Sequence, residues 1–250
     1  MPVLNPPPLP SPPEASLPPP LDLSLAPSNP ERNPFAPMPS GHDNSLGIVL
    51  RQEADRFQAL LSAMRTSLQD LQRAIQGLVV MSGDLEAMFG SLLDSRVPAL
   101  WEAKAYPSLK PLGAWTADFL DRMRFVADWI TRGEPASFWL PGLFFPQGFM
   151  TAVLQNHARK TQVPVDRLNF AFEVLQTDDV GGLEKGPTDG AFVHGLFLES
   201  ARWDPVGGCL ATAAPREMYA RLPVVHLVPR VDYEPPEDEY QCPLYKTSLR

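Results

Sequence analysis

Apolar residues recur at helical spacing between residues 50 and 78, as they do on one face of an α-helix. This stripe consists of Leu50, Phe57, Leu61, Met64, Leu68, Leu71, Ile75 and Leu78. Other faces carry the charged residues Arg51, Glu53, Arg56, Arg65, Asp70 and Arg73. Asn44 or Ser45 is suited to cap the start. The pattern predicts a long amphipathic helix that packs on its own domain, because about four heptads is short for a coiled coil.

Three further helices are predicted before residue 165. A short helix begins at Ser82 or Asp84 and ends before Pro98. A longer one, which ends at Gly133, has its apolar stripe on Leu112, Trp115, Phe119, Met123, Val126 and Ile130. The last begins at Pro146, because proline suits the first helical turn. Its apolar face consists of Phe149, Val153, Leu154 and His157.

The apolar period shortens to two after Pro164, which is typical of strands. Phe170, Phe172 and Val174 alternate and are predicted to face a core on one side of a strand. Further strands are predicted at residues 191–199, 209–213, 222–229 and 240–249, the last an edge strand because Pro243 interrupts it. Helices come first and strands second, so we expect an α+β fold. It would have a long helix and a helical bundle followed by a small antiparallel sheet or partial barrel.

The first 44 residues are predicted to form a disordered tail, because residues 1–40 contain 15 of the 30 prolines. Such a segment favours polyproline II. Pro7–Pro10 fits the PxxP spacing that SH3-type grooves accept, although no basic residue flanks it. A solvated tail and an SH3-type ligand both stay open. The predicted organisation is therefore a tail at 1–44, a helical part at 45–165 and an incomplete β-rich part at 166–250.

The charge and hydropathy of the sequence argue against nucleic acids and membranes as partners. The net charge is −8 and no basic run occurs, which disfavours binding to phosphate backbones. No stretch reaches the roughly 20 apolar residues that span a bilayer, and no signal peptide is visible at the start. Two cysteines, Cys209 and Cys242, are expected to be reduced thiols in a cytosolic protein.

Residues that carry chemistry are sparse. The phosphate-binding GxxxxGK[ST] and GxGxxG motifs and the nucleophile motif GxSxG do not occur. Four histidines show no metal-ligand spacing, and His194, His226 and Cys209 form the one grouping that strand placement could bring together. We therefore expect no catalytic residue, no cofactor-binding residue, no metal site and no cofactor.

Aromatic side chains are the strongest remaining signal. The segment FWLPGLFFPQGF contributes Phe138, Trp139, Phe144, Phe145 and Phe149, and the region around YPSLKPLG contributes Trp101, Tyr106 and Trp115. All eight are candidate docking residues. Two interpretations stay open for the first segment. Its aromatics are entirely internal core, or some fill a joint between helices and strands while the rest dock on a larger partner.

Several long strings of the ordered body resemble the C-terminal region of dynein heavy chains, most closely the axonemal subfamilies. They are YPSLKPLG, FFPQGF, GLFLESARWD and CPLYKT, with Ser200 where glycine is usual. The resemblance covers roughly residues 45–250. In that family the region packs on one face of a ring of AAA modules, with a helical part and a terminal β-barrel-like part. The proline-rich tail has no recognised counterpart, and family members continue through further strands beyond Arg250.

The resemblance implies a non-catalytic structural and regulatory segment. The ATP sites and the microtubule-binding stalk of the family lie upstream, in sequence that is absent here. The implied partners are the AAA ring modules and other dynein subunits. The implied locations are cytoplasm, cytoskeleton and ciliary axoneme. The alternative function is a free-standing interaction protein that uses the proline tail for SH3-like partners, and an enzyme is the third hypothesis.

Overall fold

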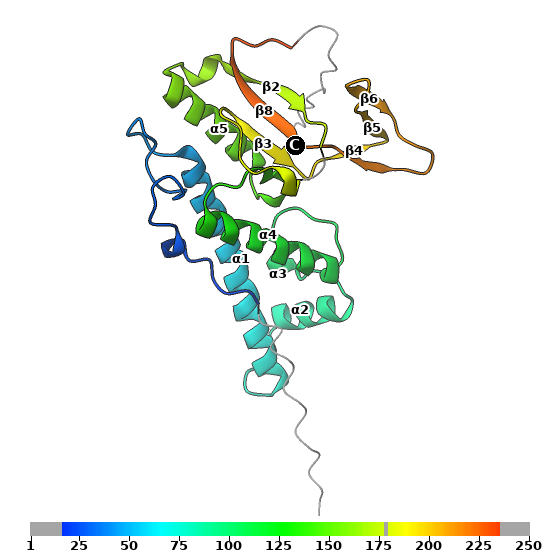
Figure 1. Ribbon diagram of the computed structural model, residues 1–250. Helices are drawn as coiled ribbons and strands as arrows, with labels where there is room; N and C mark the ends of the chain where they lie inside the picture. Colours follow the sequence, from blue (N-terminus) through cyan, green and yellow to red (C-terminus); the bar gives the residue numbers. More distant parts are fainter. Residues whose placement is uncertain (1–16, 178–179, 236–250) are drawn as a thin grey trace, which may run out of the picture. The chain divides into compact units, whose positions relative to one another are not determined.

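The computed structural model describes residues 17–177 and 180–235, and the polypeptide divides into two compact units (Figure 1). Unit 1 comprises Met1–Leu23 and Ala54–Ala127, and unit 2 comprises Ser24–Glu53 and Asp128–Arg250. The boundaries between the units fall inside the two longest helices. The sequence pattern placed its boundaries after residues 44 and 165. Among the described helices, none is both long enough and apolar enough to cross a membrane.

The helices lie close to where the hydrophobic period predicts them. They are α1 Ser45–Ile75, α2 Gly83–Leu93, α3 Ala99–Glu102, α4 Leu112–Arg132 and α5 Pro146–Thr161. Short 3₁₀ turns occur at η1 Leu23–Leu25, η2 Leu140–Gly142, η3 Val165–Arg167 and η4 Val180–Gly182. Asn44 caps α1 by accepting the N–H of Leu46 at 3.0 Å, and Ser82 caps α2 by accepting the N–H of Leu85 at 3.3 Å. The α+β fold class is thus confirmed.

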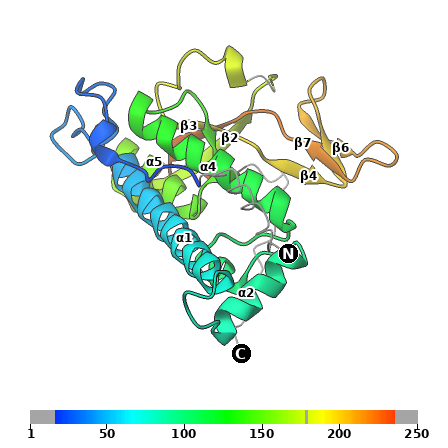
Figure 2. The same cartoon turned by 90° about the horizontal axis from the view of Figure 1, so that it is seen from below.

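Unit 1 is a small helical bundle whose core comes from the predicted stripes. Phe57 and Leu61 of α1, together with Phe119 and Val126 of α4, are fully buried. Both views place α2 beside the C-terminal end of α1 (Figures 1 and 2). The apolar stripe predicted to run from Leu50 to Leu78 is not buried at its C-terminal end. The helix finishes at Ile75, and Leu78 follows in an exposed connection.

Unit 2 combines α5 with a four-stranded sheet in the order β1–β3–β8–β2. Its strands are β1 Phe138–Trp139, β2 Leu168–Val174, β3 Ala191–His194 and β8 Val225–Val231. Two separate antiparallel pairs accompany it, formed by β4 Phe197–Glu199 with β7 Tyr219–Arg221, and by β5 Ala201–Asp204 with β6 Cys209–Thr212. The helix α5 packs against β2 and β8 (Figure 1). The sheet is mixed rather than wholly antiparallel, because β1 pairs with β3 in parallel.

Several strand predictions need correction. The expected strand at 191–199 is broken at Gly195, whose φ of +86° suits glycine rather than residues with a side chain. Phe170 is buried but Phe172 is 65% exposed, so β2 does not bury one continuous aromatic face. Residues 201–204 form a further strand, which the sequence pattern did not predict. The predicted strand at 240–249 and the PxxP motif at 7–10 lie outside the described residues.

Residues 17–44, which the proline content assigned to a disordered tail, make defined contacts within each unit. In unit 1 the N–H of Leu21 donates to Gln58 Oε1 at 3.1 Å, and Arg65 donates to the carbonyl of Pro18. In unit 2, Pro34 is buried beside the first turn of α1. Proline excludes helix and central strand, but it does not exclude an extended segment held by its carbonyl groups.

Gly47 explains how this segment approaches α1 so closely. A Cβ atom at Gly47 would lie 2.2 Å from the carbonyl oxygen of Pro34, far inside contact distance. We predict that Gly47→Ala destabilises unit 2 by about 1–3 kcal/mol, although alanine alone favours a helix by about 1 kcal/mol over glycine. Chemical denaturation measures the loss, and faster proteolysis between residues 24 and 44 should accompany it.

Gly90→Ala is the matched control, because Gly90 lies in α2 with no heavy atom within 4 Å of the added methyl group. This substitution should stabilise the protein by up to about 1 kcal/mol. Equal stabilisation by both substitutions would contradict the close packing of Pro34 on α1.

Candidate functional site

A buried carboxylate fixes the start of α5 within unit 2. The side chain of Glu53 is only 1% exposed and accepts the backbone N–H of Phe144 at 2.6 Å and of Phe145 at 3.0 Å. Phe145 is the N-cap residue of α5, and Pro146 begins the helix. A negative charge is favoured at a helix N-terminus because backbone N–H groups and the helix dipole both present positive charge there. Glu53 therefore determines the path of the FFPQGF segment.

The prediction that Glu53 lies on a face of α1 other than the apolar stripe is wrong, because Glu53 is buried. A signal for its burial was present in the spacing, since Glu53 lies three residues after Leu50 and four before Phe57, on the apolar stripe itself. An acid in the middle of an apolar stripe needs hydrogen-bond donors when it is buried. The donors here come from a segment about 90 residues later, which helical periodicity cannot reveal.

The five aromatics of FWLPGLFFPQGF divide by burial. Phe138 and Phe149 are buried, with ring centroids 4.7 Å apart, and Trp129 meets Phe138 edge-on at 4.9 Å. Trp139 and Phe144 are half-buried, whereas Phe145 is 48% exposed. The segment thus forms part of the core of unit 2 and also presents one exposed ring. Its docking role stays a prediction, which now rests chiefly on Phe145.

The second candidate group, Trp101, Tyr106 and Trp115, lies inside unit 1. Their rings stack with Trp115 in the centre, at centroid distances of 6.1 Å to Trp101 and 6.2 Å to Tyr106. The indole N–H of Trp101 donates to Ser67 Oγ of α1 at 2.9 Å. At 1–5% exposure these side chains pack internally, so they offer no outer surface in this conformation.

Charged groups cover one edge of that stack. Asp118 accepts from Arg122 Nε at 2.7 Å and from Lys110 Nζ at 2.6 Å, and Arg122 lies 3.8 Å from the centre of the Tyr106 ring. Burial would raise the pKa of Asp118, but hydrogen bonds from Lys110 and Arg122 outweigh it and hold that pKa below its ordinary value. Burial, reinforced by Asp118, raises the pKa of Tyr106. The Asp118 carboxylate therefore stays charged, and its ion pair with Arg122 holds that side chain beside the Tyr106 ring.

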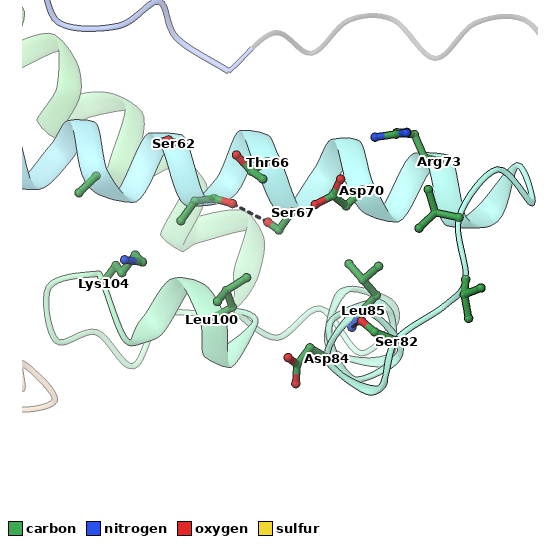
Figure 3. A pocket seen from close by; sticks show the side chains of 14 residues that line it. Ser62, Thr66, Ser67, Asp70, Arg73, Ser82, Asp84, Leu85, Leu100 and Lys104 are labelled. Atoms are coloured by element: carbon green, nitrogen blue, oxygen red, sulfur yellow. Dashed lines mark hydrogen bonds between the residues drawn. The ribbon is translucent and has the colours of Figure 1, made fainter.

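A groove on unit 1 is the second surface feature, and the sequence pattern did not indicate it (Figure 3). It has a volume of about 940 Å³. One side is the second half of α1, which has only small side chains at Ala59, Ser62, Ala63 and Thr66. Leu85 and Leu100 lie opposite α1 (Figure 3). Val79 and Val80 also line the groove.

The histidines that could have formed a metal or catalytic site bond to different partners. His194 Nδ1 lies 2.9 Å from Ser137 Oγ, and His226 Nε2 lies 2.9 Å from the carbonyl oxygen of Asp189. Burial lowers the pKa of His194. Cys209 is exposed. Within residues 17–177 and 180–235, no group of three metal-binding side chains comes together.

Comparison with known proteins gives a consistent result over nearly the whole sequence. The family model of the C-terminal domain of dynein heavy chains matches residues 14–250, a range that includes part of the proline-rich segment. Human dynein axonemal heavy chain 6 is 45% identical over 229 residues, which cover 84% of this chain and 6% of that protein. Rat dynein axonemal heavy chain 12 is 45% identical over 213 residues, or 85% of this chain and 7% of that protein.

A third relative, human dynein axonemal heavy chain 1, is 46% identical over 217 residues, which cover 86% of this chain and 5% of that protein. The chain therefore spans only 5–7% of the length of these relatives.

Replacing Glu53 tests the anchor of α5. We predict that Glu53→Gln lowers the free energy of unfolding by about 2–3 kcal/mol, because an amide keeps one acceptor but turns a donor toward a backbone N–H. Urea denaturation measures the loss. Glu199→Gln removes the same charge from an exposed position on β4 and should change stability by less than about 0.5 kcal/mol. Similar effects of both substitutions would contradict the anchoring role.

The Asp118 cluster predicts a specific acid sensitivity. A carboxyl whose pKa is lower in the folded state stabilises the fold above its unfolded pKa of about 3.9, and this stabilisation is lost as pH falls through the folded pKa. Between pH 6 and pH 3, Asp118→Asn should therefore lose less stability than the unmodified protein, by on the order of 1 kcal/mol. Denaturation at each pH tests this, with Asp121→Asn at an exposed ion pair as control. An unchanged pH dependence in Asp118→Asn would refute it.

Proposed function

Because the chain belongs to the family defined by the C-terminal domain of dynein heavy chains, we propose that it is a non-catalytic docking and regulatory segment of a dynein heavy chain. It would contact AAA ring modules and alter how they move relative to one another, and other dynein subunits are further candidate partners. The family match carries this proposal. It covers residues 14–250 and includes no AAA module. The names of the relatives add the ciliary axoneme and the cytoskeleton as the proposed location.

The exposed ring of Phe145 supports docking by a physical argument. An aromatic side chain contributes most to an interface when it is presented rigidly, because little conformational entropy is then lost on binding. The backbone N–H of Phe145 is held by the buried Glu53, and a Cβ atom on Gly148 would come within 2.6 Å of the Phe145 ring. The ring therefore lies against the backbone of α5 while 48% of the residue stays open to a partner.

An association assay tests the docking proposal. The 250-residue chain is mixed with human dynein axonemal heavy chain 6 truncated before the segment that matches it, and binding is measured by sedimentation. We expect a complex, and we expect Phe145→Ser to weaken it about tenfold, the loss of roughly 1.4 kcal/mol.

Phe172→Ser is the matched control, since Phe172 is also an exposed phenylalanine of unit 2 but lies on β2. Failure of the unmodified protein to bind would refute the proposed function. Equal weakening by both substitutions would refute the specific role of Phe145. Binding or hydrolysis of ATP by the isolated protein would contradict the non-catalytic assignment.

The alternative function requires residues 1–16 for SH3-type binding. Deleting them should leave association with the truncated heavy chain unchanged under our proposal, whereas the alternative predicts that an SH3-type partner is lost.

A further inference from the structure

We propose that the groove of unit 1 binds an amphipathic helix from another part of the dynein heavy chain, lying antiparallel to α1. This inference rests on the proposed function and identifies a second contact for it. The groove is the surface between residues 59–73 of α1 and the opposing residues of the segment 79–104 (Figure 3).

The length and shape of the groove match a helix. Residues 59–73 of α1 extend about 21 Å, which corresponds to about four helical turns. Small side chains at Ala59, Ser62, Ala63 and Thr66 form this side. Small residues let a second helix approach at the short end of the usual 8–10 Å axial spacing. A flat sheet or an extended peptide would leave much of such a trough unfilled.

The opposite side of the groove is apolar and open to solvent. Val80 is 86% exposed, Leu100 is 48% exposed and Val79 is 40% exposed. The connection that carries the valines continues this surface, with Leu78 at 68% and Met81 at 39%. A cluster of exposed aliphatic residues beside a trough is typical of a helix-binding surface, whose partner supplies apolar residues at i, i+3, i+4 and i+7.

Charges along the groove set the direction of the bound helix. Lys104 lies at the end nearest Ser62, whereas Asp70 and Asp84 lie further along the groove, toward Arg73 (Figure 3). Arg73 stands beyond Asp70 on α1. A helix has a positive N-terminus and a negative C-terminus, so its N-terminus is favoured on the half of the groove where the two acids outnumber Arg73, and its C-terminus near Lys104. Since α1 runs from Ser62 toward Arg73, the bound helix is antiparallel to it.

A buried polar contact makes the small-residue side rigid. Ser67 accepts the indole N–H of Trp101 at 2.9 Å and donates to the carbonyl oxygen of Ala63 at 2.7 Å. This contact joins α1 to α3 and fixes Leu100, the neighbour of Trp101, on the opposite side. The groove is thus held open by the core of unit 1 rather than by its occupant.

The remainder of the heavy chain is the occupant that the comparisons favour. The matched region makes up only 6% of human dynein axonemal heavy chain 6, so the domain is covalently joined to a far larger protein in that relative. A covalently joined helix is present at high effective concentration, which suits a groove of modest apolar area. A second copy of this protein has no such advantage and becomes an outcome of the test.

Groove substitutions test the inference with the same truncated heavy chain 6 as the probe. Ser62→Arg fills the groove from α1, and Val80→Asp places a charge on its apolar side. Each should weaken binding at least tenfold while leaving the thermal unfolding temperature within a few degrees of the unmodified value. Leu93→Asp is the control, because Leu93 is a 69% exposed leucine of α2 that does not line the groove. Its binding should be unchanged.

Crosslinking identifies the occupant and its direction. Asp84→Cys and Lys104→Cys, each in a background with Cys209 and Cys242 replaced by serine, are labelled with a photoreactive group. The probe peptides captured should come from one helical segment, with Asp84→Cys reacting near its N-terminus and Lys104→Cys near its C-terminus. The reverse order, or products that join two copies of this protein, would overturn the proposal.

The failures are distinguishable. If the unmodified protein binds the probe and both groove variants bind equally well, the groove inference is refuted and the proposed function stands. If the unmodified protein does not bind, the proposed function fails and the groove inference fails with it.

Discussion

One buried carboxylate connects the two sequence segments that make up unit 2, Ser24–Glu53 and Asp128–Arg250. Glu53 accepts the N–H groups of Phe144 and Phe145, and these residues directly precede α5. Placing an ionised group in an apolar interior is unfavourable unless donors surround it, so folding must bring both N–H groups to Glu53 for unit 2 to form. The position of α5 then follows, and α5 in turn packs on β2 and β8. Asn156, which accepts the N–H of Ser45 at 2.9 Å, ties the same helix to the first residue of α1.

The hydrogen bonds of Glu53 also determine which aromatic side chains are buried and which are exposed. Phe145 is the N-cap of α5 and Phe149 follows one turn later, so fixing the backbone at Phe145 also fixes Phe149 in the core against Phe138. The ring of Phe145 stays exposed and the ring of Phe149 is buried, because Glu53 fixes the position at which α5 starts. This is why a segment with five aromatics in twelve residues serves both as core and as surface. The interpretation that all five aromatics are internal core is therefore wrong, because Phe145 is exposed, whereas docking through the exposed ring stays a prediction.

The helices were predictable because their stabilisation is local in sequence. Trp115, Phe119, Val126 and the other members of their stripes repeat at helical spacing, and caps such as Asn44 and Ser82 stand immediately before them. The parts that the sequence did not predict depend on distant partners. The short strand β1 forms only because His194 and Val193 lie beside it, and the contacts of residues 17–44 need α1 and a glycine at 47. The groove was missed for the same reason, since it needs α1, the connection after it and α3 together.

Each unit places an exposed apolar feature directly over a buried polar contact. Phe145 lies over the Glu53 anchor in unit 2, and the groove lies over the Ser67–Trp101 hydrogen bond in unit 1. Buried hydrogen bonds fix geometry more strictly than apolar contacts, which tolerate sliding and repacking. Exposed aliphatic surface such as Val80 lowers the solubility of an isolated domain. Burying such surface is favourable by about 25 cal/mol for each Å². A fold that holds such surface rigidly fits the proposal that a larger polypeptide covers it, and the matched regions make up 5–7% of the axonemal relatives.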